Sequence, residues 1–295
     1  MDKETLNKMP KWSNQRNLKE YGDKYGLILS DDIDSLFSCI ILNKLFGTKV
    51  GAFYSFNKMY INKNITKNRK PIGVDADFIH KRCYGNHVTL LSNGDIKNDK
   101  CVNLNNIFNI NSNNYTKKYA GSTLLTIISM YNYPIKNLTE EAKMILWCID
   151  VAYKGYFYNN YIIKKTHKDY FTKILELEDM YNVLERHKEE EFKNIIDKYK
   201  LYKNIYINKS ENLETEIDLK SLSKIFNLNL MLPKREFKLK HIYKQECKNI
   251  KYIPKNKKYI QDNLKENEYI FSLALTYTNS IKYTISKKNK VSQMA

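Results

Sequence analysis

The chain has 295 residues, of which 42% are hydrophobic and 13% aromatic, and this composition excludes an intrinsically disordered chain. Its 50 Lys and Arg residues outnumber its 32 Asp and Glu residues, so the formal net charge of +18 either attracts polyanions such as nucleic acid or reflects a coding bias toward Lys and Asn. Scattered cysteines without a Cys-x-x-Cys pair, a charged start without an apolar signal region, and no run of about 18 apolar residues predict reduced thiols, no membrane contact and a cytoplasmic location.

The N-terminal half begins with an apolar run that leads into an amphipathic stretch. Residues 25–30 predict a buried strand, and the spacing of apolar residues over 33–46 predicts a helix. Asp31 and Asp32 are candidate N-caps of this helix, and Gly47 is its expected end. Further along, the pattern predicts strands at 50–56, 71–74 and 87–91, a Lys- and Asn-rich loop at 57–70, and helices at 115–131 and 139–151.

The second half differs in texture and contains no glycine from residue 160 onward. Together, the two halves predict an α/β fold, in which a mostly parallel sheet with helices on both faces is followed by a smaller α+β C-terminal domain. We expect a first domain at 1–160, a helical connector at 161–200 and a C-terminal substrate or partner domain at 201–295. The elements predicted after residue 160 are a long charged helix at 171–199, a strand at 204–208, a helix at 219–226, and a hairpin of 269–277 with 281–286.

Acidic residues follow two of the predicted strands. Asp31, Asp32 and Asp34 come directly after the first strand, whereas Asp75 and Asp77 follow a later one. In open parallel sheets, ligands bind at the carboxyl ends of the strands, so these side chains lie where a site is expected. Such a stretch is also an ordinary helix cap, but crowded carboxylates repel one another unless a cation or hydrogen bonds compensate. The second acid pair favours metal binding over capping alone.

Two further residues extend this pattern. His87 follows the second acid pair within a short loop. Asp150 ends a largely apolar stretch, in which an unpaired carboxylate would be costly. Aspartate oxygens combined with a single imidazole suit Mn²⁺ or Mg²⁺ better than zinc or copper. The residues therefore favour a manganese or magnesium site.

The order of these motifs resembles the DHH phosphoesterases over residues 25–157. The family's first motif, His-x-Asp-x-Asp-Gly, falls on 30–35, where both aspartates match and Ser30 and Ser35 replace the His and the Gly. The namesake Asp-His-His falls on 85–87, where only His87 matches. The other matching features are the strand-end Asp75, the helix start Ala120-Gly121-Ser122-Thr123 and the late Asp150.

The resemblance implies a pair of manganese ions bridged by Asp75. It assigns Asp34, His87 and Asp150 to one ion together with Asp75. The second ion would keep Asp32 and Asp75 but lack its imidazole, with Asp31 or Asp77 as substitutes. The resemblance further implies that backbone N–H groups near Gly121 and Ser122 hold a phosphate oxygen, although these residues also fit an ordinary helix start. The family's Gly-Gly-Gly-His loop has no counterpart here.

Three readings of function follow from these observations. The first is metal-dependent hydrolysis of a phosphoester or phosphodiester bond in a nucleotide, oligonucleotide or single-stranded nucleic acid, with Mn²⁺ or Mg²⁺ as the cofactor. The second is a catalytically inactive DHH-like module that binds nucleic acid or a protein partner, and Ser30 and Gly85-Asn86 favour it. In the third, the acids only cap helices and the net charge is compositional.

Overall fold

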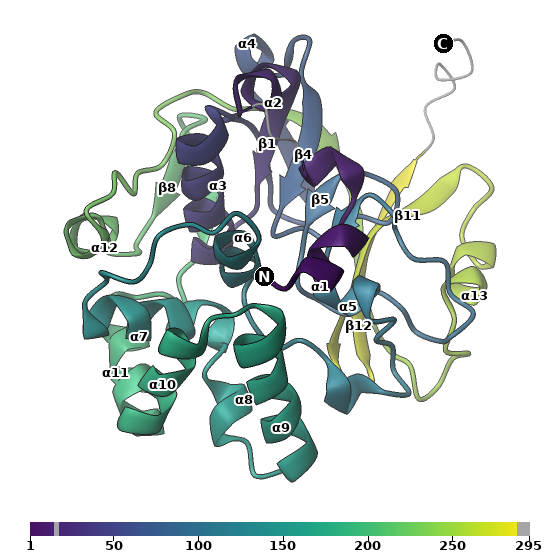
Figure 1. The fold of residues 1–295 in the computed structure, drawn as a ribbon. Coiled ribbons are helices and arrows are strands. Elements are labelled where there is room, and N and C mark those ends of the chain that lie inside the picture. Colours follow the sequence, from purple (N-terminus) through teal and green to yellow (C-terminus); the bar gives the residue numbers. More distant parts are fainter. Residues whose placement is uncertain (15–17, 288–295) are drawn as a thin grey trace.

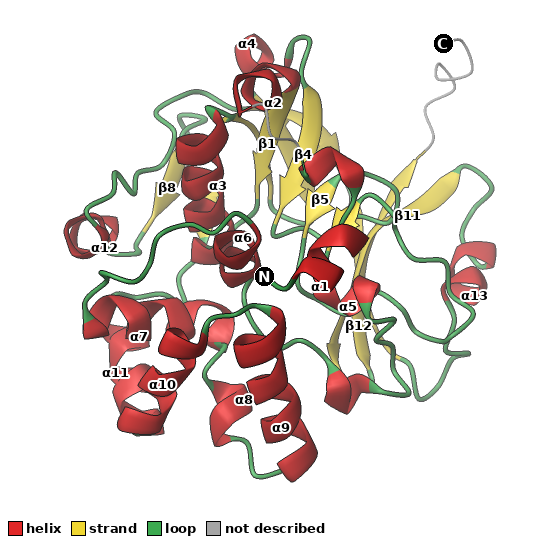
Figure 2. Ribbon diagram, in the orientation of Figure 1, coloured by secondary structure: helices red, strands yellow, loops and turns green. Residues whose placement is uncertain are grey.

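The computed structural model describes residues 1–14 and 18–287, and a seven-stranded sheet forms its centre (Figure 1). Helices flank this sheet, and a smaller antiparallel sheet of the C-terminal region lies beside it (Figure 2). The predicted α/β class with a mostly parallel sheet is therefore confirmed. The strands of the central sheet are β1 (Tyr25–Leu29), β2 (Lys49–Tyr54), β3 (Lys58–Ile61), β4 (Lys70–Val74), β5 (Cys83–Tyr84), β6 (Cys101–Val102) and β9 (Lys238–Ile242).

The central sheet contains a reversal of strand order next to β1. The order across the sheet is β6-β5-β4-β1-β2-β3-β9. From β6 to β2 every neighbouring pair is parallel, whereas β3 and β9 run antiparallel to their neighbours. Because the chain adds β2 on one side of β1 and β4 on the other, a topological switch point lies between β1 and β4. Crevices outside the carboxyl ends of strands at such points are the usual ligand sites of open α/β sheets.

Local sequence explains the first strand and helix. Every residue of β1 is buried, as expected for an apolar strand at the centre of a parallel sheet. Helix α3 (Ile33–Phe46) has the predicted limits, because Asp32 caps its first turn and Gly47 ends it in a left-handed conformation with a φ of 68°. The side chain of Asp32 accepts a hydrogen bond from the backbone N–H of Ser35.

Twelve further helices complete the described part of the chain. Several 3-10 turns accompany them, including one at Ile149–Val151 directly after α7. No described helix is long and apolar enough to cross a lipid bilayer. The helices are α1 (Lys3–Lys8), α2 (Leu18–Lys24), α4 (Lys63–Thr66), α5 (Leu104–Ile107), α6 (Thr123–Met130), α7 (Glu140–Cys148), α8 (Lys154–Phe157), α9 (Tyr161–Asp169), α10 (Glu178–Arg186), α11 (Glu189–Lys198), α12 (Leu219–Phe226) and α13 (Lys257–Asp262).

The prediction of one long helix at 171–199 is wrong. The segment forms a π-helical turn followed by α10 and α11, with an extended break at His187. Leu184 of α10 and Phe192 of α11 are both fully buried in the same core, so the chain bends to bring both apolar faces inward. The imidazole of His187 contacts Glu140 and Glu191 at 3.1 and 3.0 Å and supports the bend.

Three other local predictions need correction. The helix predicted at 115–131 begins only at Thr123, because Ser122 caps it after a separate 3-10 turn. The residues 87–91 make only one isolated bridge, at Val88, and the strand of this region is β5. The Lys- and Asn-rich segment predicted as a loop contains β3 and α4, since Met59 and Ile65 supply buried apolar side chains.

The C-terminal region forms a small sheet of β10 (Lys244–Asn249), β12 (Ser280–Lys287) and β11 (Glu268–Tyr277), in that order. The predicted hairpin is confirmed as β11 and β12, and β7 (Ile205–Ile207) pairs separately with β8 (Leu213–Thr215). Strand β9, which comes directly before β10 in the chain, belongs to the central sheet and pairs with β3. The backbone N–H groups of Leu273 and Leu275 donate to the carbonyls of Asp77 and Val88 at 3.1 and 2.8 Å. The small sheet is thus attached to the loops that follow β4 and β5.

Gly73 of β4 tests how tightly the central sheet packs against Phe78 in the loop that follows β4. A Cβ at this position would lie 2.4 Å from Cε2 of the buried Phe78 ring. Because overpacking of a core costs about 1–3 kcal/mol, we expect Gly73→Ala to lower the free energy of unfolding by that amount in urea titrations. Gly94→Ala is the control, since nothing lies within 4 Å of its Cβ position. Equal transition midpoints for the two variants would contradict this packing.

Candidate functional site

The carboxyl ends of adjacent parallel strands bring the predicted acids together. Strands β1, β4 and β5 are neighbours and run in the same direction, so the segments that follow them share one edge of the sheet. This edge includes both sides of the switch point. The side chains delivered there are Asp31, Asp32 and Asp34 after β1, Asp75 and Asp77 after β4, and Asn86 and His87 after β5.

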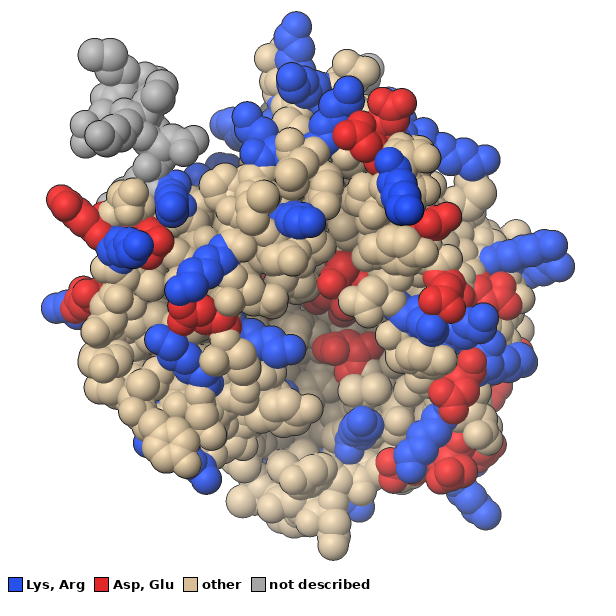
Figure 3. Space-filling model, turned by 180° about the vertical axis from the view of Figure 1, so that it is seen from behind, with Lys and Arg blue, Asp and Glu red and all other residues tan. Residues whose placement is uncertain are grey.

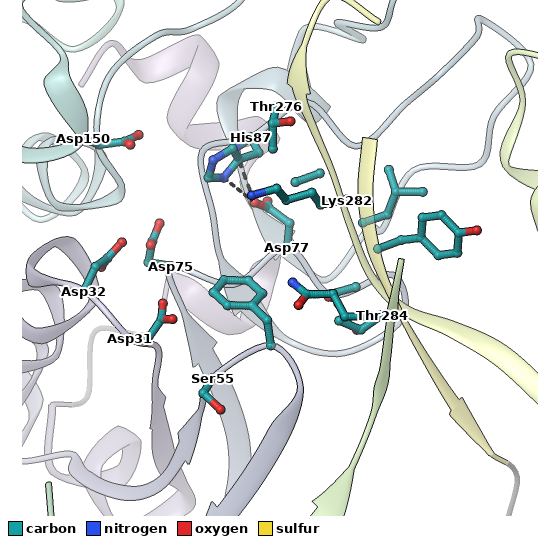
Figure 4. Close-up of a pocket in the computed structure, with 16 residues that line it drawn as sticks. Asp31, Asp32, Ser55, Asp75, Asp77, His87, Asp150, Thr276, Lys282 and Thr284 are labelled. Carbon is teal, nitrogen blue, oxygen red and sulfur yellow. Dashed lines mark hydrogen bonds and ion pairs between the residues drawn. The ribbon is translucent and has the colours of Figure 1, made fainter. Parts of the chain in front are cut away.

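A cavity of about 380 Å³ opens at this edge, between the acids and the small C-terminal sheet. In Figure 4 the carboxylates of Asp32, Asp75 and Asp150 point toward a common space. From behind, the molecule is hollowed, with acidic atoms inside the hollow and Lys and Arg side chains around it (Figure 3). The acidic wall of the cavity consists of Asp31, Asp32, Asp75, Asp77 and Asp150 together with His87.

Asp34 lies behind this wall and anchors the start of α6. Its two carboxylate oxygens accept the backbone N–H groups of Thr123 and Leu124 at 2.7 and 2.8 Å. The hydroxyl of Thr123 donates to Asp75 Oδ1 at 2.8 Å, so one residue links the two predicted ligands. Asp34 is fully buried, and it also lines a second cavity of about 300 Å³, which Asp31, Asp32 and Asp150 share.

Asp150 reaches the site from the 3-10 turn after α7. The sequence suggested a buried carboxylate, but the residue is exposed. Its backbone is left-handed, with a φ of 52°, and Asp75 has the same conformation with a φ of 53°. Non-glycine residues with positive φ are uncommon and gather at functional sites. Asn86 fixes the Asp150 side chain by donating to Oδ2, and the same amide donates to the carbonyl of Gly121 at 2.9 Å.

His87 is oriented by a buried carboxylate. Its Nδ1 lies 3.0 Å from Asp77 Oδ2, and Asn103 donates to Asp77 Oδ1 at 2.9 Å. Among the described residues, no hydrogen bond involves Nε2 of His87, and the ring lines the cavity. A carboxylate that holds one imidazole nitrogen while the other faces a cavity is the usual support of a metal-binding histidine. Gly85 makes this possible, because a Cβ there would lie 2.2 Å from Asp77 Oδ1.

Burial and mutual repulsion raise the pKa values of the clustered acids. Desolvation raises the pKa of Asp32 to about 6, and the charges of Asp31 and Asp150 add to this effect. Desolvation also holds the pKa values of Asp34 and Asp75 well above the usual range, with Asp32 as the next cause for both. Asp150 raises the pKa values of all three residues, so the clustered carboxylates form one electrostatic unit.

Basic side chains do not neutralise this unit. No described Lys or Arg lies within 4.0 Å of a carboxylate oxygen of Asp32, Asp34, Asp75 or Asp150. The ion pair between His87 and Asp77 accompanies a pKa of about 9 for His87, because the hydrogen bond and charge of Asp77 outweigh the opposing effect of burial. Within 1–14 and 18–287, no three His, Cys, Asp or Glu side chains already form a closed metal-ligand group.

Gly121 and Ser122 do not face the cavity. Both are buried, and Ser122 acts as the N-cap of α6 by accepting the backbone N–H of Leu125 at 3.1 Å. The first free N–H groups of α6 donate to Asp34 and leave no place for a phosphate oxygen. These residues therefore behave as the ordinary helix start that the sequence also allowed.

Sequence reasoning missed the amide side chains that hold the site together. Asn105 donates to the carbonyls of Asn86 and Tyr119 at 2.6 and 3.1 Å, and its own oxygen accepts the N–H of Tyr119 at 2.8 Å. Asn103 supports Asp77, as described above, and caps α5. The signal was present as a strand end followed by Asn103, which is a preferred N-cap residue. The high Asn content of the chain masked this signal.

Comparisons of the chain with protein families, with characterised proteins and with solved structures give no match.

The raised pKa values predict how the stability of the metal-free chain depends on pH. A carboxyl whose folded pKa exceeds its unfolded value destabilises the fold as pH rises between the two values, from 3.8 to about 6 for Asp32. The stability that His87 contributes is complete below pH 6.5 and is lost as pH rises through about 9. We therefore expect the Tm in chelator to fall from pH 6 to pH 9 in calorimetric scans.

Divalent cations should reverse this loss. At about 100 times its Kd, a ligand stabilises the folded state by about 2.7 kcal/mol, which corresponds to about 5 °C or more for a chain of this size. We expect Mn²⁺ to raise the Tm at pH 8 and to have a smaller effect at pH 5.5, where protons compete for the carboxylates. A Tm that is unaffected by Mn²⁺ at both pH values would contradict metal binding at this cavity.

The pair of Asp77 and His87 gives a second electrostatic test. Asp77→Asn removes the negative charge while it keeps the size of the side chain. Since an adjacent opposite charge shifts a pKa by about 1–3 units, we expect the pKa of His87 to fall by that amount in an NMR titration of the metal-free chain. His80 and His241 serve as internal controls, because burial and neighbouring lysines, and not Asp77, lower the pKa of each. A pKa that stays near 9 in the variant would exclude Asp77 as the cause.

Proposed function

We propose that the chain is a divalent-metal-dependent phosphoesterase that acts on a nucleotide, an oligonucleotide or the end of a single-stranded nucleic acid. The observation that carries this proposal is the group of Asp32, Asp75 and Asp150, whose carboxylates face one cavity without a Lys or Arg ion pair among the described residues. Several carboxylate oxygens that face one cavity provide the ligands that Mn²⁺ and Mg²⁺ prefer.

The donor atoms fit such an ion. Among the described residues, no hydrogen bond involves Asp32 Oδ2, Asp75 Oδ2 or Asp150 Oδ1, so one oxygen of each carboxylate is available. Nε2 of His87 provides the nitrogen ligand, whereas Asp34 holds α6 behind the site. When bound, the metal would lower the pKa of a water molecule and neutralise charge that develops on the phosphoryl group.

The chain itself would supply orientation. In phosphoester hydrolysis, a water oxygen forms a bond to phosphorus, the bond from phosphorus to the ester oxygen breaks, and the departing oxygen takes up a proton. Asp77 fixes the ring of His87 and Asn86 fixes the side chain of Asp150, so neither must be ordered when substrate binds. The net charge of +18 and the Lys and Arg side chains around the hollow favour a polyanionic substrate.

The positions that depart from the DHH pattern have structural counterparts in this chain. Ser35, in place of the motif glycine, donates to the carbonyl of Val74 and accepts the N–H of Ser30, each at 2.7 Å, and so joins the ends of β1 and β4. Gly85, in place of the first namesake residue, leaves the space that Asp77 occupies. These features support a divergent DHH-like phosphoesterase. The cysteines, none of which forms a disulfide in the described chain, fit the cytoplasmic location that we propose.

One observation favours a non-catalytic module as the second candidate. Ser30 replaces the first-motif histidine, and its hydroxyl is buried without a hydrogen-bond partner among the described residues. It does not line the cavity and adds no nitrogen ligand to a second ion. A chain that binds a single metal and a polyanion without turnover would fit this feature.

Asp75→Asn distinguishes these candidates. The amide keeps the shape of the side chain but removes the charge at the centre of the cluster. We expect the affinity for Mn²⁺, measured by calorimetry, to fall about 10–100-fold and hydrolysis of bis-p-nitrophenyl phosphate to fall by about 10³-fold or more.

Asp197→Asn, an exposed substitution on α11, is the matched control and should behave as the wild type. Mn²⁺ uptake without turnover by the wild type would favour the non-catalytic module. Absence of both uptake and turnover in the wild type would remove both metal-dependent candidates.

A further inference from the structure

The small C-terminal sheet has two chemically different faces. Along β12, the side chains of Ile281, Tyr283 and Ile285 are buried in a core of their own, together with Leu273 and Leu275 of β11. The alternate residues of β12 include Lys282 and Thr284, which line the cavity. Because successive side chains of a strand point to opposite faces, the sheet turns a polar face toward the acidic wall.

This polar face consists mainly of short side chains around one lysine. Lys282 pairs in register with Ala274 of β11 and with Cys247 of β10, so its direct neighbours leave room beside it. In Figure 4, Lys282 extends from its strand into the cavity, on the side opposite Asp32 and Asp150. The polar and small residues of the sheet that line the cavity are Gln245, Ser272, Ala274, Thr276, Lys282 and Thr284.

The polar wall is fixed relative to the acids. The hydroxyl of Tyr54, at the end of β2, lies 2.9 Å from both Ser272 Oγ and Thr284 Oγ1, and these two oxygens lie 2.8 Å apart. The backbone of Leu273 also donates to the carbonyl of Asp77, the residue that orients His87. Lys282 is therefore carried by a wall that is joined to β2 through Tyr54 and to the loop after β4 through Leu273.

The ammonium group of Lys282 forms no ion pair with a described residue. On the same sheet, Lys244 and Lys248 both pair with Glu246. No described carboxylate lies within 4.0 Å of Lys282. Its ammonium is near enough to the cluster to lower the pKa of Asp31, although burial and the hydrogen bond from Asn204 are larger influences on that acid. Among the described residues that line the cavity, an ammonium without an ion pair thus faces a wall of carboxylates.

We infer that Lys282 is the phosphate-binding residue of this cavity, where it holds a phosphoryl oxygen of a small phosphoester across from the acidic wall. This inference rests on the proposed function, because only a cation on the acidic wall allows an anion to lie between the walls. An ammonium group is a common phosphate ligand as a point charge. The volume of about 380 Å³ suits a ligand of about nucleotide size and is too small for a folded duplex.

The test uses the full chain and inorganic phosphate as the probe, measured by calorimetry in Mn²⁺. Lys282→Met removes the charge and keeps most of the aliphatic stem, Lys282→Arg keeps the charge, and Lys287→Met is the control on the same strand outside the cavity. We expect Lys282→Met to weaken phosphate binding about tenfold or more, since hydrogen bonds to charged groups contribute at this level. Lys282→Arg should restore most of the affinity, and Lys287→Met should match the wild type.

A second readout separates this inference from the proposed function. The affinity for Mn²⁺ should stay unchanged or rise slightly in Lys282→Met, because the variant loses a positive charge near the acids. If the wild type hydrolyses no phosphoester but its phosphate affinity still depends on Lys282, the inference stands and the hydrolase proposal fails. If Lys282→Met and the wild type bind phosphate equally, or if neither binds it, the assignment of Lys282 is overturned.

Discussion

Uncompensated negative charge at the switch point of the sheet is the constraint on which the rest of the site depends. Burial raises the pKa values of Asp32, Asp34 and Asp75, the charge of Asp150 adds to this effect for all three, and no described Lys or Arg pairs with them. Folding supplies partial compensation through backbone N–H groups, as in the two that α6 donates to Asp34. The remaining charge faces a cavity, where a solvated cation can reach it.

The surrounding structure holds these charges together against their repulsion. Thr123 links Asp34 and Asp75 through one backbone and one side-chain hydrogen bond. The side-chain amides of Asn86 and Asn103 likewise hold Asp150 and Asp77 in place by donating hydrogen bonds to their carboxylates. Two of the acids occupy left-handed backbone conformations, which are retained only where neighbouring interactions determine them. Sites that bind a cation hold their carboxylates rigidly close together before the cation arrives.

Sequence patterns predicted the elements that depend on local rules. The limits of α3 and the end of β4 in acidic residues followed from apolar spacing and capping chemistry. The bend at His187 did not, because it arises from two apolar faces that must reach one core. Asp150 was expected to be buried, yet a left-handed turn carries it to the surface of the cavity. The cavity wall that contains Lys282 depends on tertiary packing of a strand far away in the sequence, which local spacing does not encode.

The attachment of the small sheet has a consequence for how the cavity is entered. Strand β9 lies at the edge of the central sheet, and β11 is hydrogen-bonded to the loops behind the acids. A hinge motion between the two walls would require these backbone hydrogen bonds to break. The fold therefore sets the width of the opening, and the walls do not close around a ligand. Selection among ligands then depends on whether their size allows them to diffuse through an opening of fixed width. Water leaves the cavity only where the ligand fills the space.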